Sequence, residues 1–206
     1  MRPQKIGAIK ASLHDMNLEE LRELSDDLAS LIEVLVTRQE AVESTIVDRL
    51  CSDHWKVTPQ EKSWHVRFIK LAHEVAEWSK DPSTKVGCVL VKNKRVISTG
   101  YNGFPKNISD SFDRLMDREQ KYEMTVHAEI NAITTAALHG VSTEGSTAYI
   151  TFNPCSRCSA VLINAGIDSI YVSTANDIPT RWLENFILAS KLLAEAGVEY
   201  HTIDAT

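Results

Sequence analysis

Two short stretches decide how this chain folds: TVHAEINAI, residues 125–133, and NPCSRC, residues 153–158. Each is placed to begin a helix, the first near His127 and the second near Cys155, with a strand-like run between them. Cysteines three residues apart lie on one face of a helix, so Cys155 and Cys158 can point at the same ion. The partial positive charge at a helix N-terminus also favours the thiolate, the form of cysteine that binds metals. The two helix starts are therefore predicted to form one site.

One imidazole and two thiolates are typical ligands of a catalytic zinc. A structural zinc takes four protein ligands, whereas His127, Cys155 and Cys158 would leave a fourth position open for water. Glu129 stands two residues beyond the histidine and could reach that water without binding the metal. A zinc that activates water, together with a glutamate that moves protons, meets the requirements for hydrolytic deamination of a nucleobase. The C-x-x-C stretch alone also fits half of a structural zinc site or a redox pair, and the H-x-E stretch alone fits an ordinary helix start.

The patterns around these stretches predict an α/β fold with three layers, α/β/α. Helices are expected from residue 59 to before KDPSTK, from 127 to 139, from 155 to 165 and from 181 to 196, and strands at 86–92, 95–101, 147–152, 169–174 and 198–203. The first two strands read as a hairpin. Because a helix connects the last two strands, these should run parallel through a right-handed crossover. The expected core is a five-stranded mixed sheet with helices on both faces.

The bulk composition indicates a globular protein outside the membrane. The 206 residues are 43% hydrophobic and 24% charged, and no apolar run approaches the roughly 20 residues that span a bilayer. The N-terminal MRPQKIGAIKASLHD lacks the apolar core of a signal peptide, so a cytoplasmic location is expected. Of the four cysteines, Cys51 has no partner at metal-ligand spacing and Cys88 lies in an apolar run. Only Cys155 and Cys158 indicate chemistry.

The charge distribution favours a small substrate over a nucleic acid polymer. The formal net charge is −6. Residues 1–10 carry three positive charges, and residues 11–50 carry ten Asp or Glu against three Arg, which leaves −2 for residues 51–206. A protein that grips a polynucleotide usually presents a basic face. We therefore expect neither a polynucleotide nor a membrane as partner.

Residues 1–55 are predicted to form a helical extension ahead of a domain at 56–206. Leucines recur there at alternating spacings of three and four residues, at positions 21, 24, 28, 31 and 35. This is a heptad-like stripe on an acidic helix, too narrow and too charged to be stable alone. The helix could cover its own domain, pair with another subunit or dock on another protein, and the sequence leaves these alternatives open.

HAEINAI followed by PCSRC resembles the zinc-dependent cytidine/deoxycytidylate deaminase superfamily. Residues 81–105, DPSTKVGCVLVKNKRVISTGYNGFP, resemble the deoxycytidylate (dCMP) deaminases in particular, and the similarity extends over about residues 60–205. The resemblance implies that His127, Cys155 and Cys158 bind zinc and that Glu129 carries protons. It implies hydrolysis of dCMP to dUMP and ammonia, which would supply dUMP for thymidylate synthesis. Members are commonly hexameric, so a homo-oligomer is expected.

The resemblance also implies substrate contacts. The asparagine of GYNG, Asn102, would contact the sugar, although it also fits a turn residue. Arg118 and Lys121 lie in DREQKYE, which resembles the family just before the zinc histidine, and would bind phosphate. Each could instead be a solvated surface charge. Some members hold a second, structural zinc in the stretch that corresponds to residues 104–126, but here it contains neither Cys nor His, so one Zn2+ per chain is expected.

Several other functions remain possible on sequence grounds. The substrate could be dCTP, a 5-substituted dCMP, free cytidine or a tRNA adenosine, and the net charge of residues 51–206 argues against the last. A scaffold that works through its N-terminal helix is the alternative from a different class. An intact set of zinc ligands with Glu129 argues against the scaffold, because a platform needs no proton carrier.

Overall fold

The structure is a computed structural model that describes residues 59–174 and 180–203. The helical extension expected for residues 1–55, with its leucine stripe, lies outside the described residues. The start expected for the domain, at residue 56, lies outside them as well. Within the described ranges, no helix is long and apolar enough to cross a membrane.

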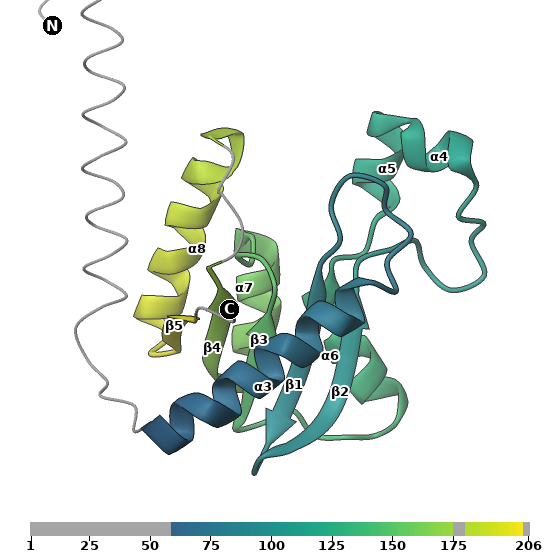
Figure 1. The fold of residues 1–206 in the computed structure, drawn as a ribbon. Coiled ribbons are helices and arrows are strands. Elements are labelled where there is room, and N and C mark those ends of the chain that lie inside the picture. The colour runs from purple at the N-terminus through teal and green to yellow at the C-terminus, as the bar shows by residue number, and fades with distance from the viewer. Residues whose placement is uncertain (1–58, 175–179, 204–206) are drawn as a thin grey trace, which may run out of the picture. The chain divides into compact units, whose positions relative to one another are not determined.

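Five strands form one sheet in the order β2-β1-β3-β4-β5 (Figure 1). The strands are β1 (Gly87–Lys92), β2 (Arg95–Tyr101), β3 (Ser146–Ile150), β4 (Ile167–Ser173) and β5 (Glu199–Ile203). β1 runs antiparallel to both β2 and β3, whereas β3, β4 and β5 run parallel to one another. The mixed sheet with parallel last strands is therefore confirmed, as is the β1–β2 hairpin.

Helices cover both faces of this sheet. The covering helices are α3 (Pro59–Ala76), α6 (Ala128–Leu138), α7 (Ser156–Asn164) and α8 (Leu183–Glu195). The connections hold two short helices, α4 (Phe112–Met116) and α5 (Arg118–Met124), and a 3-10 helix, η1 (Thr180–Trp182). Side chains alternate along a strand, so Val89 of β1 packs with α3 while Cys88 and Leu90 pack with α6, α7 and α8. The three-layer α/β/α arrangement is confirmed. Cys88 is a fully buried core residue.

The connection at residues 102–126 is more ordered than its polar sequence suggests. It contains α4 and α5, which extend from the body of the domain (Figure 1) and have no buried residue. Asp117 ends α4 and caps α5, because its carboxylate accepts hydrogen bonds from the backbone N–H groups of Glu119 and Gln120. Helices of 5 and 7 residues are shorter than the stretch over which a hydrophobic period can be recognised, so periodicity does not detect them.

Helix α6 lies unusually close to β2. A Cβ atom added to Gly100 would stand 2.3 Å from the carbonyl oxygen of Ala128 and 2.3 Å from the backbone nitrogen of Ala132. Next to it, the Ser98 hydroxyl donates to the Ala132 carbonyl at 2.7 Å, and the Asn131 amide donates to the Tyr101 carbonyl at 2.7 Å. Only glycine permits this approach, which sets the position of the helix that begins after His127.

We expect Gly100→Ala to lower the free energy of unfolding by about 3 kcal/mol, because the new methyl group meets backbone atoms that cannot move without displacing α6. Urea unfolding of the purified chain measures the change. Gly103→Ala is the matched control, since the nearest atom to a Cβ there is a Tyr101 ring carbon at 3.9 Å. Equal losses in the two variants would show that the α6–β2 approach is not tightly constrained.

Candidate active site

The candidate site lies where two helices begin side by side. His127 is the N-cap residue of α6 and Cys155 is the N-cap residue of α7, and both have extended backbone conformations (ψ 156° and 167°). Each side chain therefore projects from the N-terminal end of its helix and not from the side of the helix. The partial positive charge of both helix N-termini favours an anionic ligand such as a thiolate at this point. Cys158 adds a second sulfur from the first turn of α7.

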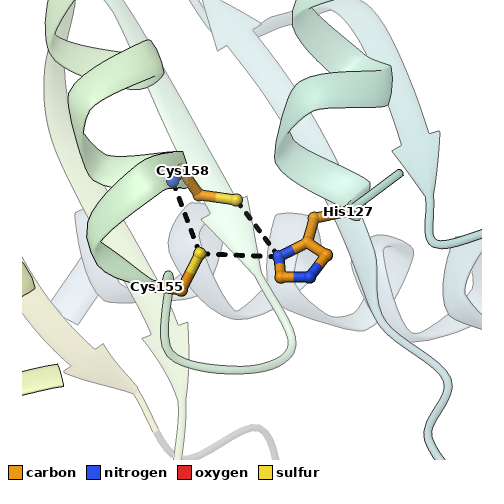
Figure 2. A group of neighbouring side chains, drawn as sticks. All are labelled: His127, Cys155 and Cys158. Carbon is orange, nitrogen blue, oxygen red and sulfur yellow. Dashed lines mark hydrogen bonds between the residues drawn. The ribbon is translucent and has the colours of Figure 1, made fainter. Parts of the chain in front are cut away.

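The three predicted metal ligands face one another (Figure 2). The Nδ1 atom of His127 lies 3.3 Å from the sulfur of Cys158 and 3.6 Å from the sulfur of Cys155. A tetrahedral zinc with ordinary bond lengths would separate a nitrogen and a sulfur ligand by about 3.6 Å. Within residues 59–174 and 180–203, this is the one group of three His, Cys, Asp or Glu side chains close enough to hold a metal ion. The donor set fits one zinc.

The two cysteines form an unequal pair. A hydrogen bond from Cys158 lowers the pKa of Cys155 to about 4, with help from His127, although burial acts in the opposite direction. The same hydrogen bond, together with burial, raises the pKa of Cys158. The hydrogen bond to Cys155 also raises the pKa of His127. Zinc binds thiolates, so its binding must release the Cys158 proton.

Glu129 is a buried carboxyl beside these ligands. Its side chain lies in the first turn of α6 and the residue is only 3% exposed. Burial raises its pKa to about 7, while the charge of His127 acts to lower it. A carboxyl of this kind can exchange protons near neutral pH. It stands beside the three grouped ligand atoms without being one of them.

An apolar wall stands against the two cysteines. Phe186 of α8 is buried against Cys155 and Cys158, and partly buried apolar side chains complete the cluster: Ile130, Phe152 and Trp182. This wall brings residues of α8 and η1 to a centre whose ligands come from α6 and α7. Such an apolar, aromatic lining with a few polar groups is typical of a small-molecule site.

Asn102 is buried, and its side chain fixes the residues just before the β1–β2 hairpin. Its side-chain oxygen accepts from the Val86 N–H at 2.7 Å, and its amide donates to the Thr84 carbonyl at 2.9 Å. Its own carbonyl accepts from the Ser79 hydroxyl at 2.8 Å. The structure therefore gives Asn102 a structural role, and the sugar contact stays a prediction.

Lys121 and Arg118 have different surroundings. The Lys121 ammonium lies 3.2 Å from the Asp81 carboxylate and 2.7 Å from the Ser83 hydroxyl, with a side chain only 12% exposed. Arg118 is exposed, and its guanidinium lies over the Tyr122 ring and donates to the Tyr122 hydroxyl at 3.2 Å. Of these two cations, Arg118 is the one directed to the surface.

Two further cations escaped the sequence analysis. The charge of Arg181, in η1, helps to lower the pKa of Tyr122, after the larger effect of the Arg118 hydrogen bond. Arg157, between the two cysteines, opposes protonation of His127. The charge of Arg157 therefore acts on a predicted metal ligand, and that of Arg181 on the Tyr122 ring that Arg118 contacts. Arg157 could have been predicted to lie near the site from its position inside the C-x-x-C stretch. Nothing in the sequence around Arg181 indicated that it would lie near Tyr122.

Comparison with known proteins identifies the family. Residues 62–174 match the cytidine and deoxycytidylate deaminase zinc-binding region. The chain belongs to this family. His127, Glu129, Cys155 and Cys158 all lie within the matched residues, so the resemblance stated from the sequence is confirmed.

The most informative relatives agree with this assignment. An uncharacterized deaminase from the luxG 3' region of Aliivibrio fischeri is 42% identical over 137 residues, which cover 66% of this chain and 90% of that protein. A probable deoxycytidylate deaminase of Caenorhabditis elegans is 34% identical over 148 residues, covering 68% and 69%. The structure of the dCMP deaminase from cyanophage S-TIM5 with dCMP and dUMP aligns with a TM-score of 0.56 at 26% identity, over 72% of this chain and 100% of that one.

The Asp81–Lys121 pair gives a pH-dependent prediction. Burial tends to raise the pKa of Asp81, but hydrogen bonds from Ser83 and Thr84, with the bond from Lys121, outweigh it and bring the pKa below 3.8. A carboxyl with a lowered pKa stabilises the fold above its unfolded pKa and loses this contribution as the pH falls through the folded value. Asp81→Asn should therefore lower the free energy of unfolding by about 2 kcal/mol at pH 7. The difference in the free energy of unfolding between this variant and wild type should become smaller below about pH 4.

Urea unfolding at pH 7 and pH 3 measures both effects. Asp110→Asn is the matched control, because it removes the carboxylate from an exposed ion pair with Lys80 at 2.8 Å. Exposed pairs contribute less than about 1 kcal/mol. A gap for Asp81→Asn that stayed constant down to pH 3 would contradict an electrostatic role.

Proposed function

We propose that the chain is a zinc-dependent enzyme that hydrolyses dCMP to dUMP and ammonia. The observation that carries the proposal is the convergence of His127, Cys155 and Cys158 with the buried Glu129 beside them. The family assignment supports deamination of a cytosine compound. Relatives named deoxycytidylate deaminases, and a similar structure that holds dCMP and dUMP, support dCMP as the substrate.

In this proposal His127, Cys155 and Cys158 hold the metal and Glu129 moves the protons. Bound there, zinc would supply a Lewis acid that generates a nucleophile from water near neutral pH. Glu129 takes a proton from the attacking water, passes it to the ring nitrogen of cytosine and later delivers a proton to the departing ammonia. Water is added and ammonia is lost, so the carboxyl ends the cycle as it began. The apolar cluster around Phe186 packs against the two cysteines.

We assign the phosphate of the substrate to Arg118, with Arg181 as a further cation that acts on the same Tyr122 ring. Arg118 is exposed, and a guanidinium can bind phosphate with two parallel hydrogen bonds. The Lys121 ammonium already contacts Asp81 and Ser83, so its assignment to phosphate is the weaker part of the prediction. Asn102 is proposed to present its remaining hydrogen-bonding capacity to the sugar.

The wider setting is also a proposal. We place the enzyme in the cytoplasm as a homo-oligomer, where dUMP would serve as the precursor for thymidylate. Support for self-association comes from large apolar side chains on α4 and α5, among them Phe112 at 70% exposure, Met116 at 58% and Tyr122 at 51%. Exposed apolar groups gathered in this way are typical of interaction surfaces.

Glu129→Gln is expected to reduce ammonia release from dCMP by at least about 100-fold, because the amide has the same size but cannot carry the proton. The assay compares dCMP, dCTP, CMP, deoxycytidine and 5-methyl-dCMP with wild-type protein and added zinc. The control is Glu119→Gln, an exposed glutamate on α5. Preferred turnover of dCTP or of the methylated nucleotide would overturn the substrate assignment, and a Glu129→Gln variant of unchanged activity would overturn the mechanism.

Arg118→Ala should raise KM for dCMP by about tenfold and leave deoxycytidine turnover unchanged, because only the nucleotide carries a phosphate. Steady-state kinetics on both substrates provides the test. Arg95→Ala is the control, since it removes one positive charge at the exposed start of β2. Equal losses on the nucleotide and the nucleoside would assign Arg118 to the structure of the site and not to the phosphate.

A further inference from the structure

Two side chains from the C-terminal part of the chain hold the loop that carries Cys155. The Asn185 side-chain oxygen, on α8, accepts from the Ser156 N–H at 2.8 Å, and its amide donates to the Ser156 hydroxyl at 3.1 Å. The Tyr200 hydroxyl, on β5, donates to the Asn153 side-chain oxygen at 2.6 Å. These contacts are at least partly buried, so water competes weakly for them.

The two contacts stand on either side of Cys155. Asn153 precedes it by two residues and Ser156 follows it directly. Ser156 is the first residue of α7, and its N–H is one of the groups that has no partner inside the helix. Asn185 supplies that partner. The backbone that carries the Cys155 sulfur is thus fixed both before and after the residue by elements that follow it in the chain.

The two supporting side chains lie outside the part of the chain that identifies the family. The match to the zinc-binding region ends at residue 174, whereas Asn185 and Tyr200 stand beyond it. The ligands Cys155 and Cys158 therefore belong to the matched region, but their support comes from α8 and β5. Phe186 of α8 also packs against the same two cysteines, so α8 contacts this site through apolar packing as well as through hydrogen bonds.

We infer that Asn185 and Tyr200 are positioning residues for the metal, which act through Ser156 and Asn153 to hold the Cys155 sulfur at the distance from His127 that a zinc ion requires. The inference rests on the zinc-dependent function proposed above. Residues that orient a metal ligand through hydrogen bonds commonly change metal affinity by 10- to 100-fold when they are removed. A ligand side chain that is not held in place must be ordered when the metal binds. The conformational entropy lost in this ordering weakens metal binding.

The test measures metal binding by the full-length chain, independently of activity. Zinc affinity comes from competition with a chromophoric chelator, and the ligand geometry comes from the absorption bands of the Co2+-substituted protein. The variants are Asn185→Leu, which removes both hydrogen bonds, Tyr200→Phe, which removes one oxygen, and Asn185→Asp, which keeps an acceptor for the Ser156 N–H. Ser190→Ala is the matched control, because its hydroxyl bonds within α8 to the Phe186 carbonyl at 3.0 Å.

Asn185→Leu and Tyr200→Phe should each weaken zinc binding by about tenfold and shift the Co2+ bands. Asn185→Asp should keep most of the affinity, and Ser190→Ala should behave as wild type. Wild-type affinity and spectra in both Asn185→Leu and Tyr200→Phe would overturn the inference, even if their melting temperatures fell, because that would leave a purely structural role. Should Asn185→Leu fail to fold, Tyr200→Phe and Asn185→Asp decide the question.

The outcome for wild type separates this inference from the function on which it rests. A wild-type chain that binds no zinc would overturn the proposed function and the inference together. A wild-type chain that binds zinc tightly and deaminates dCMP, with unaltered metal binding in the two loss variants, would overturn the inference alone.

Discussion

The N-termini of α6 and α7 meet at His127 and Cys155, and the rest of the site depends on this meeting. The nitrogen-to-sulfur distances of 3.3 and 3.6 Å suit a single tetrahedral ion. Both helix N-termini contribute positive potential there, which favours thiolates and a carboxylate over their protonated forms. Burial of Glu129 acts in the opposite direction on that carboxyl. The balance of these two effects leaves the glutamate able to give and take a proton.

The sheet determines where the two helices begin. Helix α7 follows β3 directly and lies on the same face of the sheet as α6, while Gly100 allows α6 to approach β2 closely enough to fix its first turn. Asp81 joins Lys121 of α5 to the loop that precedes β1. Backbone packing thus fixes the start of α6, and a buried ion pair ties α5, the helix before it in the chain, to the loop that precedes β1.

Local patterns were enough to predict the fold and the meeting of His127, Cys155 and Cys158. The i, i+3 spacing of Cys155 and Cys158, the alternating strands and the glycine helix stops all act over a few residues, and the structure agrees with them. The surroundings of Lys121 were not accessible in this way, because its partner Asp81 is 40 residues away. Asn185 and Tyr200 contact residues 29 and 47 positions away, so spacing gave no signal for them. Helices α4 and α5 have only 5 and 7 residues, too few for a hydrophobic period to show, and they escaped for that reason.

The central claim is that one zinc ion is held by His127, Cys155 and Cys158, and elemental analysis of the purified chain tests it most directly. Cys158→Ala and Cys88→Ala make a matched pair, since both replace a fully buried cysteine, but Cys88 lies in the core between β2 and β3. One zinc per chain is expected in wild type and in Cys88→Ala, with a large loss in Cys158→Ala. A chain without zinc, or a Cys158→Ala variant that retains it, would contradict a zinc site at these residues.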